Sequence, residues 1–160
     1  MTQGARANRS GHVLETTVEG TLQGHKYFKV GAKGRKQQDR EYLLTSNLLP
    51  KRYARNVYIG TGIYQNDLYA DFYIVGSPII SSGLIIECKW QQITGSVDEK
   101  YPYLNLNIKE SYPDPTIVVI GGKAMRAGAI TWFKKQVSCN PNLLAVYDLD
   151  SFVAWTNKNL

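Results

Sequence analysis

The chain of 160 residues carries a net charge of +6 and is 43% hydrophobic, so it is long enough to bury a core without disulfides or structural metal ions. No stretch approaches ~18 apolar residues, and the N-terminus lacks the apolar centre of a secretory signal, which argues against a membrane protein. Cys88 and Cys139 form neither a disulfide framework nor a zinc-binding pair. We therefore predict one domain over residues 1–160 of a reduced, cytoplasmic protein.

The net positive charge of the chain lies between residues 26 and 55, which hold nine basic residues and two acidic ones. A basic segment beside a nearly neutral body is typical of a protein that binds a polyanion such as DNA. The same composition suits a solvated loop that keeps the protein soluble, and the sequence leaves both readings open. If the segment binds DNA, the expected contacts are Lys33, Arg35, Lys36, Lys51, Arg52 and Arg55, with Tyr42 and Tyr53 beside the backbone.

The first predicted element is a helix over residues 11–23. Apolar residues recur every fourth position from Leu14 to Leu22 and form one stripe along this helix. Ser10 is a suitable N-cap, and Gly24 is a suitable end. The helix is therefore expected to pack one face on a core.

Residues 25–60 are polar and basic, and they predict loops with one or two short strands. Two strands follow at 71–75 and 84–91, joined by the turn-rich connector 76–83. Side chains alternate between the two faces of a strand. The second strand should therefore present Ile85, Glu87, Lys89 and Gln91 on one face and Leu84, Ile86, Cys88 and Trp90 on the other.

The C-terminal half alternates between helical and strand patterns. Ser96 and Glu99 fit a capping box for a helix reaching to about residue 110, but Pro102 would lie deep in it, so the helix starts nearer Pro102 or bends there. The remaining predicted elements are a strand at 116–120, a helix at 126–138, a strand at 143–149 and a helix at 150–155. This order predicts an α/β or α+β domain with a mixed central sheet flanked by helices.

Two acidic residues and a lysine form the candidate site. If the two central strands pair as an antiparallel hairpin about their connector, Asp71 lies opposite residue 87 or 88 and its carboxylate approaches that of Glu87. Lys89 lies about 6.6 Å further along the strand, on the same side as Glu87. A divalent cation would offset the repulsion between the carboxylates, and Mg²⁺, or Mn²⁺ in its place, suits oxygen ligands from Asp71, Glu87 and the Cys88 carbonyl. Such an ion can activate a water molecule that attacks a phosphodiester, assisted by Lys89.

The order of these residues resembles the PD-(D/E)XK nuclease superfamily. Asp71 is followed sixteen residues later by Glu-Cys-Lys at 87–89, after an N-terminal helix that carries Glu15. The denser stretch "IIECKWQQITGSVDEKYPYL" is similar to a branch of small nucleases from bacteria and their phages. One departure is the absence of a proline before Asp71, where Ala70 stands.

The resemblance implies a restriction-endonuclease-like fold with Asp71 and Glu87 as metal ligands and Lys89 as the catalytic lysine. It further implies that Gln91 is an auxiliary site residue and that Glu15 is a helical acid beside the metal. From the residues alone, Gln91 could instead make a cross-strand hydrogen bond, and Glu15 could be a solvated helix residue. Lys100 could reach a phosphate or be an exposed lysine without such a role.

We therefore predict a Mg²⁺-dependent DNA endonuclease, expected to be a homodimer because cutting both strands takes two sites. The alternative is a nucleic-acid-binding module that has the nuclease fold, performs no chemistry and serves a larger assembly. His12 and His25 lack partners at zinc-ligand spacing. The stretch "IGGKAMRAG" lacks the phosphate-binding arrangement of glycines and lysine, so no nucleotide cofactor is expected.

Overall fold

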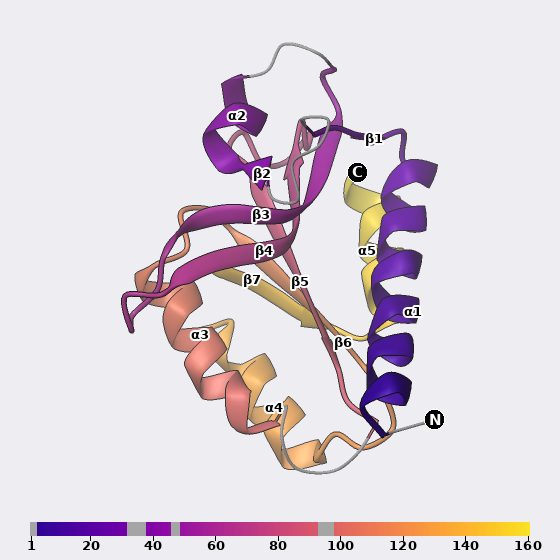
Figure 1. Cartoon of the computed structure of the whole chain (residues 1–160), viewed down its shortest axis with the longest axis vertical. Helices are drawn as coiled ribbons and strands as arrows, with labels where there is room; N and C mark the ends of the chain where they lie inside the picture. Colours follow the sequence, from indigo (N-terminus) through magenta and orange to yellow (C-terminus); the bar gives the residue numbers. More distant parts are fainter. Residues whose placement is uncertain (1–2, 32–37, 46–48, 93–97) are drawn as a thin grey trace.

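A computed structural model describes residues 3–31, 38–45, 49–92 and 98–160. Its elements are α1 (Gln3–Gly24), β1 (Phe28–Lys29), β2 (Gln38–Asp39), α2 (Arg40–Thr45), β3 (Arg52–Thr61), β4 (Asp67–Val75), β5 (Leu84–Trp90), the 3₁₀ turn η1 (Asp98–Lys100), α3 (Tyr101–Glu110), β6 (Thr116–Gly121), α4 (Ala127–Gln136), β7 (Leu143–Tyr147) and α5 (Leu149–Asn159) (Figure 1).

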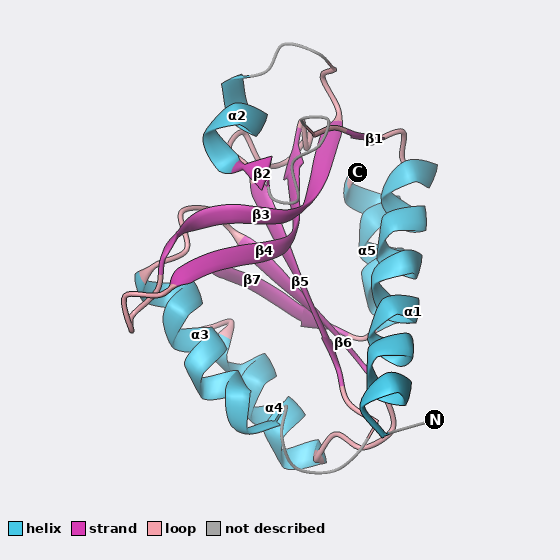
Figure 2. Cartoon of the chain, in the orientation of Figure 1, coloured by secondary structure: helices cyan, strands magenta, loops and turns pink. Residues whose placement is uncertain are grey.

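The strands form one mixed sheet in the order β1-β3-β4-β5-β6-β7, and β2 also pairs with β3. The β3–β4–β5 meander is antiparallel, whereas β5, β6 and β7 are parallel because α3 and α4 provide the crossover connections. Helices α1 and α5 lie on one side of the sheet, and α3 and α4 lie on the other (Figure 2). The predicted α/β architecture, a restriction-endonuclease-like mixed sheet flanked by helices, is confirmed.

Helix α1 packs as its apolar stripe predicts, because Leu14, Val18 and Leu22 are all buried against the sheet. It ends at Gly24, as expected, but begins at Gln3. The prediction of Ser10 as the N-cap was therefore wrong, since the preceding turns contain good helix formers that carry no apolar period. Among the described residues, no helix is long and apolar enough to cross a membrane.

The prediction of mostly loops over residues 25–60 was wrong at its C-terminal end, where the ten-residue strand β3 lies. The strand has a polar sequence because Arg52 and Arg55 lie within it, and a polar sequence is typical of a loop. The Arg52 guanidinium donates to the carbonyl oxygens of Leu43, Leu44 and Leu49 at 2.8, 3.2 and 2.7 Å. These partners let a charged residue occupy a buried strand position.

The C-terminal elements occur in the predicted order. Pro102 lies in the first turn of α3, so the helix starts at Tyr101 rather than bending at the proline. Ser96, half of the expected capping box, lies outside the described residues. Helix α5 extends to Asn159, beyond the predicted end, and Asp148 caps it by accepting a hydrogen bond from the Ser151 N–H at 2.8 Å.

The hairpin register is the feature that positions the candidate site. Phe72 pairs with Ile86, Tyr73 with Ile85 and Ile74 with Leu84. Continuing this register by one residue places Asp71 opposite Glu87, one of the two partners that the hairpin geometry predicts. The predicted alternation also holds, because Tyr73 and Ile85 lie in the core under α3 and α4, whereas Phe72 and Ile86 lie in the core under α1.

Candidate active site

Asp71, Glu87 and Lys89 meet where β4 and β5 separate. The Lys89 ammonium lies 2.6 Å from Glu87 Oε2 and 3.4 Å from Asp71 Oδ2. It therefore bridges two carboxylates from neighbouring strands. The hairpin brings together the two acids and the lysine that the sequence singles out.

The Asp71 side chain ends the β4–β5 ladder at this point. The Cys88 N–H donates to Asp71 Oδ2 at 2.7 Å instead of to a backbone carbonyl of β4. Because the N–H and C=O of a strand residue point to the same side, the Cys88 carbonyl also faces β4 beyond the last ladder pair. The Cys88 side chain points to the α1 side, where burial raises the pKa of its thiol. Cys88 can thus offer a backbone oxygen to the site, and its thiol is an apolar contact.

Glu87 is buried, with 3% of its surface exposed. The Tyr112 hydroxyl donates to Glu87 Oε1 at 3.0 Å, and the Lys89 ammonium contacts the other oxygen. Burial raises the pKa of Glu87 to about 7; the Lys89 charge opposes this shift and the Asp71 charge adds to it. A cation bound near Glu87 therefore stabilises the charged form of this carboxylate.

For Lys89, burial works to lower the side-chain pKa, but the charges of Glu87 and then Asp71 outweigh it, and the pKa is raised. The ammonium is consequently protonated at neutral pH. It can donate hydrogen bonds and stabilise negative charge, but it cannot serve as a general base there.

The residues present fit a hard divalent cation. Lys89 already holds a positive charge between the Asp71 and Glu87 carboxylates, and the Cys88 carbonyl faces the same opening. Among the described residues, no three His, Cys, Asp and Glu side chains cluster as a metal site. Two carboxylates and a carbonyl leave room for the waters and substrate oxygens with which Mg²⁺ completes its coordination.

Glu15 lies on α1 and pairs with a basic residue of β3. Its carboxylate forms an ion pair with Arg55. Arg55 also contacts Glu19 at 3.2 Å and lies over the Phe72 ring. In this arrangement Glu15 links α1 to β3, and its charge also helps to raise the pKa of the Cys88 thiol on β5.

Gln91 is likewise occupied by structural contacts. It is 2% exposed, its Oε1 accepts from the Asp98 N–H at 3.1 Å, and its Nε2 donates to the Ala124 carbonyl at 3.2 Å. The side chain therefore joins the end of β5 to the turns before α3 and α4. The geometry favours the hydrogen-bonding reading of this residue over a direct role in the chemistry.

The basic residues expected to contact DNA are in different environments. Arg52 is buried, and Arg55 is paired with acids. Lys51 donates to the Leu160 carbonyl at 2.7 Å. Lys33, Arg35 and Lys36 lie outside the described residues. Tyr53 is fully buried, so neither it nor Arg52 has the exposed surface needed to contact a DNA backbone.

Glu87 and Lys89 line a pocket of ≈ 200 Å³. Lys100 also lines this pocket. Its position suits the interpretation in which this lysine reaches a phosphate. The sequence analysis missed the aromatic wall, although the stretch "EKYPYLNL" carried a signal in its closely spaced tyrosines. The full lining is Leu68, Glu87, Lys89, Lys100, Tyr101, Tyr103, Leu104, Asn107 and Tyr112.

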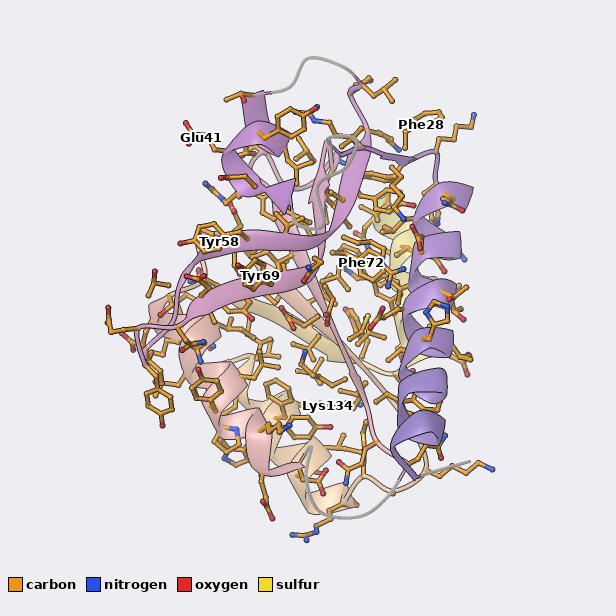
Figure 3. All side chains as sticks on the ribbon, in the orientation of Figure 1. Phe28, Glu41, Tyr58, Tyr69, Phe72 and Lys134 are labelled. Carbon is orange, nitrogen blue, oxygen red and sulfur yellow. The ribbon has the colours of Figure 1, made fainter. Side chains whose placement is uncertain are left out.

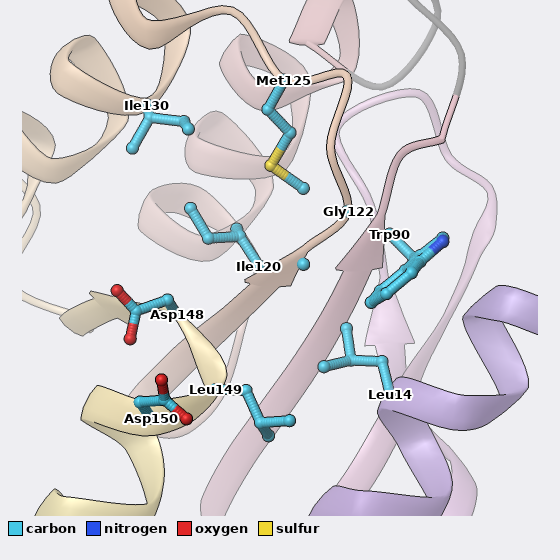
Figure 4. A pocket seen from close by; sticks show the side chains of 10 residues that line it. Leu14, Trp90, Ile120, Gly122, Met125, Ile130, Asp148, Leu149 and Asp150 are labelled. Carbon is cyan, nitrogen blue, oxygen red and sulfur yellow. The ribbon is translucent and has the colours of Figure 1, made fainter.

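A larger pocket of ≈ 330 Å³ lies beyond the carboxyl ends of β5 and β6 (Figure 4). Trp90 and Leu14 form one wall, and Asp148 and Asp150 lie at the start of α5. Asp148 is accounted for as the α5 cap. None of the three clustered groups lines this pocket, so the candidate chemistry belongs to the smaller one.

A mixed sheet with two acids and a lysine where an antiparallel hairpin separates defines a nuclease-like fold. A family model described as the PD-(D/E)XK nuclease superfamily domain matches residues 6–160. The chain therefore belongs to the PD-(D/E)XK nuclease superfamily, which confirms the resemblance seen in the sequence. Comparisons with curated proteins and with solved structures found no match.

Proposed function

We propose that the protein is a Mg²⁺-dependent endonuclease that hydrolyses phosphodiester bonds in DNA. The observation that carries this proposal is the Lys89 ammonium held between the Asp71 and Glu87 carboxylates. Membership of a nuclease superfamily supports a nucleic-acid substrate. Lys100 at the same pocket adds a cation suited to a phosphate.

Asp71, Glu87 and the Cys88 carbonyl would hold the ion, with Mn²⁺ as a substitute. When bound, Mg²⁺ supplies Lewis acidity toward a phosphoryl oxygen and an activated water. In hydrolysis the water oxygen bonds to phosphorus while the bond to the leaving sugar oxygen breaks, and the proton lost by water is balanced by one gained at the leaving oxygen. Lys89 stabilises the negative charge that develops on the phosphate, and Tyr112 keeps Glu87 in place.

We also propose that the protein is a homodimer. Each chain carries one candidate site, and cutting both strands of a duplex takes two sites. Lys33, Arg35 and Lys36 remain predicted DNA contacts in the basic segment. Arg52 is no longer proposed as one, since its three guanidinium bonds are all to backbone carbonyls of the same chain.

The proposal predicts Mg²⁺-dependent cleavage by the wild-type protein and its loss in Asp71→Asn. Supercoiled plasmid, linear duplex, a four-way junction and single strands would each be incubated with Mg²⁺ and with EDTA. Asp71→Asn keeps the size of the side chain but removes the charge that a cation requires. Absence of cleavage on every substrate, with DNA binding unchanged by EDTA, would favour the non-catalytic binding module instead.

Metal binding should depend on pH with a midpoint near neutrality. Glu87 must lose its proton to ligate a cation, and burial raises its pKa to about 7. The apparent Mn²⁺ affinity should therefore rise between about pH 6 and pH 8 and level off above. Tyr112→Phe removes a hydrogen bond that favours the charged form, so it should move the midpoint to higher pH.

Calorimetric titration at a series of pH values measures this midpoint. Tyr58→Phe is the matched control, because Tyr58 packs against the Tyr69 ring on the β3–β4 hairpin (Figure 3). Identical midpoints for Tyr112→Phe and the wild-type protein would contradict the role given to Tyr112.

A further inference from the structure

Two stacked tyrosine rings form an open surface beside the catalytic pocket. Tyr64, in the turn between β3 and β4, is 75% exposed. Its ring centroid lies 5.0 Å from that of Tyr103 on α3, with 29° between the ring planes. An aromatic side chain this exposed and yet stacked on a second ring presents a π-face to solvent.

The turn that carries Tyr64 is anchored to α3. The Ile63 N–H donates to Asn107 Oδ1 at 3.0 Å, and the Tyr103 hydroxyl donates to Asn66 Oδ1 at 3.1 Å. Asn107 is itself buried. The hairpin tip therefore lies against α3 (Figure 1), and the position of the Tyr64 ring is supported from both sides of the turn.

The stack is continuous with the site. Tyr103 lines the same pocket as Glu87, Lys89 and Lys100. A ligand that reaches the carboxylates thus passes next to an aromatic surface and two cations. A nucleotide combines the matching features, since its phosphate is anionic and its base has a flat π-face.

We propose that Tyr64 and Tyr103 form a stacking site for an unpaired nucleobase, adjacent to the phosphodiester that is cut. A base inside a duplex is already stacked on both faces, so only an unpaired base can use this surface without disrupting a helix. The substrate class is then single-stranded DNA, or a duplex with an unpaired end or flap. This inference rests on the proposed function for its substrate, and it adds a preference for unpaired nucleotides.

The test is DNA binding in EDTA, measured by fluorescence anisotropy with a labelled single strand, the same strand with abasic positions, and a blunt duplex. Wild-type protein should bind the intact strand more tightly than the abasic one. Tyr64→Ala should weaken binding of the intact strand by about tenfold, the loss of one base–aromatic stack. It should leave duplex and abasic binding nearly unchanged, while Tyr64→Phe, which keeps the ring, should bind like the wild-type protein.

Phe28→Ala is the matched control, because Phe28 is an aromatic residue with 54% exposure on β1, away from the hairpin tip (Figure 3). Unchanged single-strand affinity in Tyr64→Ala would overturn the proposal. Equal losses for intact strand, abasic strand and duplex would also overturn it, because they would assign Tyr64 to the DNA backbone rather than to an unpaired base. Since no metal is present, these outcomes are independent of whether the protein cleaves DNA.

Discussion

Lys89→Ala is expected to lower the rate of Mg²⁺-dependent DNA cleavage by about 10²–10³-fold, the usual cost of removing one group that stabilises transition-state charge. The ammonium lies 2.6 Å from Glu87 and 3.4 Å from Asp71, so it is next to any phosphate bound there. Glu87 and Asp71 remain in the variant, and divalent-metal binding should persist. The expected signature is lost turnover with retained metal binding.

The same variant should respond more strongly to metal in thermal unfolding. Without Lys89, the charge that opposes the rise in the pKa of Glu87 is lost, and no resident ammonium competes with a metal ion for the two carboxylates. Added Mg²⁺ should therefore raise the unfolding temperature of Lys89→Ala by more than that of the wild-type protein. Lys135→Ala, an exposed lysine on α4, serves as the control and should match the wild type in both assays. Cleavage at the wild-type rate by Lys89→Ala would remove Lys89 from the chemistry.

Arg52→Met is expected to reduce the free energy of unfolding by about 3 kcal/mol, because the carbonyl oxygens of three residues each lose a charged donor. Arg52 is 7% exposed, and its guanidinium joins β3 to the end of α2 and to the Leu49 carbonyl. Methionine keeps most of the apolar stem, so the loss reports the hydrogen bonds rather than a cavity.

Chemical denaturation monitored by tryptophan fluorescence measures this difference. Lys158→Met, an exposed position on α5, should change the stability little. DNA affinity of folded Arg52→Met should stay near the wild-type value, since the side chain faces the protein interior. A stable variant with much weaker DNA binding would return Arg52 to the role that the sequence suggested.

The α1 stripe and the β4–β5 hairpin could be predicted from the sequence because each depends on local periodicity. Leu14, Val18 and Leu22 recur at helical spacing, and all three are buried. Strand alternation and the length of the connector were sufficient to place Asp71 opposite residue 87 or 88, and the observed register continues to Glu87. The cluster of acids and lysine follows from this register alone.

Other assignments depended on partners far away in the chain. Arg52 and Arg55 resemble solvated basic residues until their partners, the α2 carbonyls and the α1 acids, are brought beside them. From the sequence, Glu15 could lie beside a metal or be a solvated helix residue, and the approach of β3 to α1 pairs it with Arg55. The Gln91 side chain is held by hydrogen bonds to two turns, at residues 7 and 33 positions further along the chain.

Short-range periodicity was enough to predict the mixed sheet flanked by helices, and the resemblance carried by Asp71 and Glu87-Cys88-Lys89 implied the nuclease-like class and its three candidate groups. Which charged residues face the site and which hold the fold together depended on the tertiary structure. It also brought Tyr112 to Glu87 and Tyr64 to Tyr103. Such contacts join residues far apart in the chain, and no local pattern records which distant partner will satisfy a charge or cover a ring.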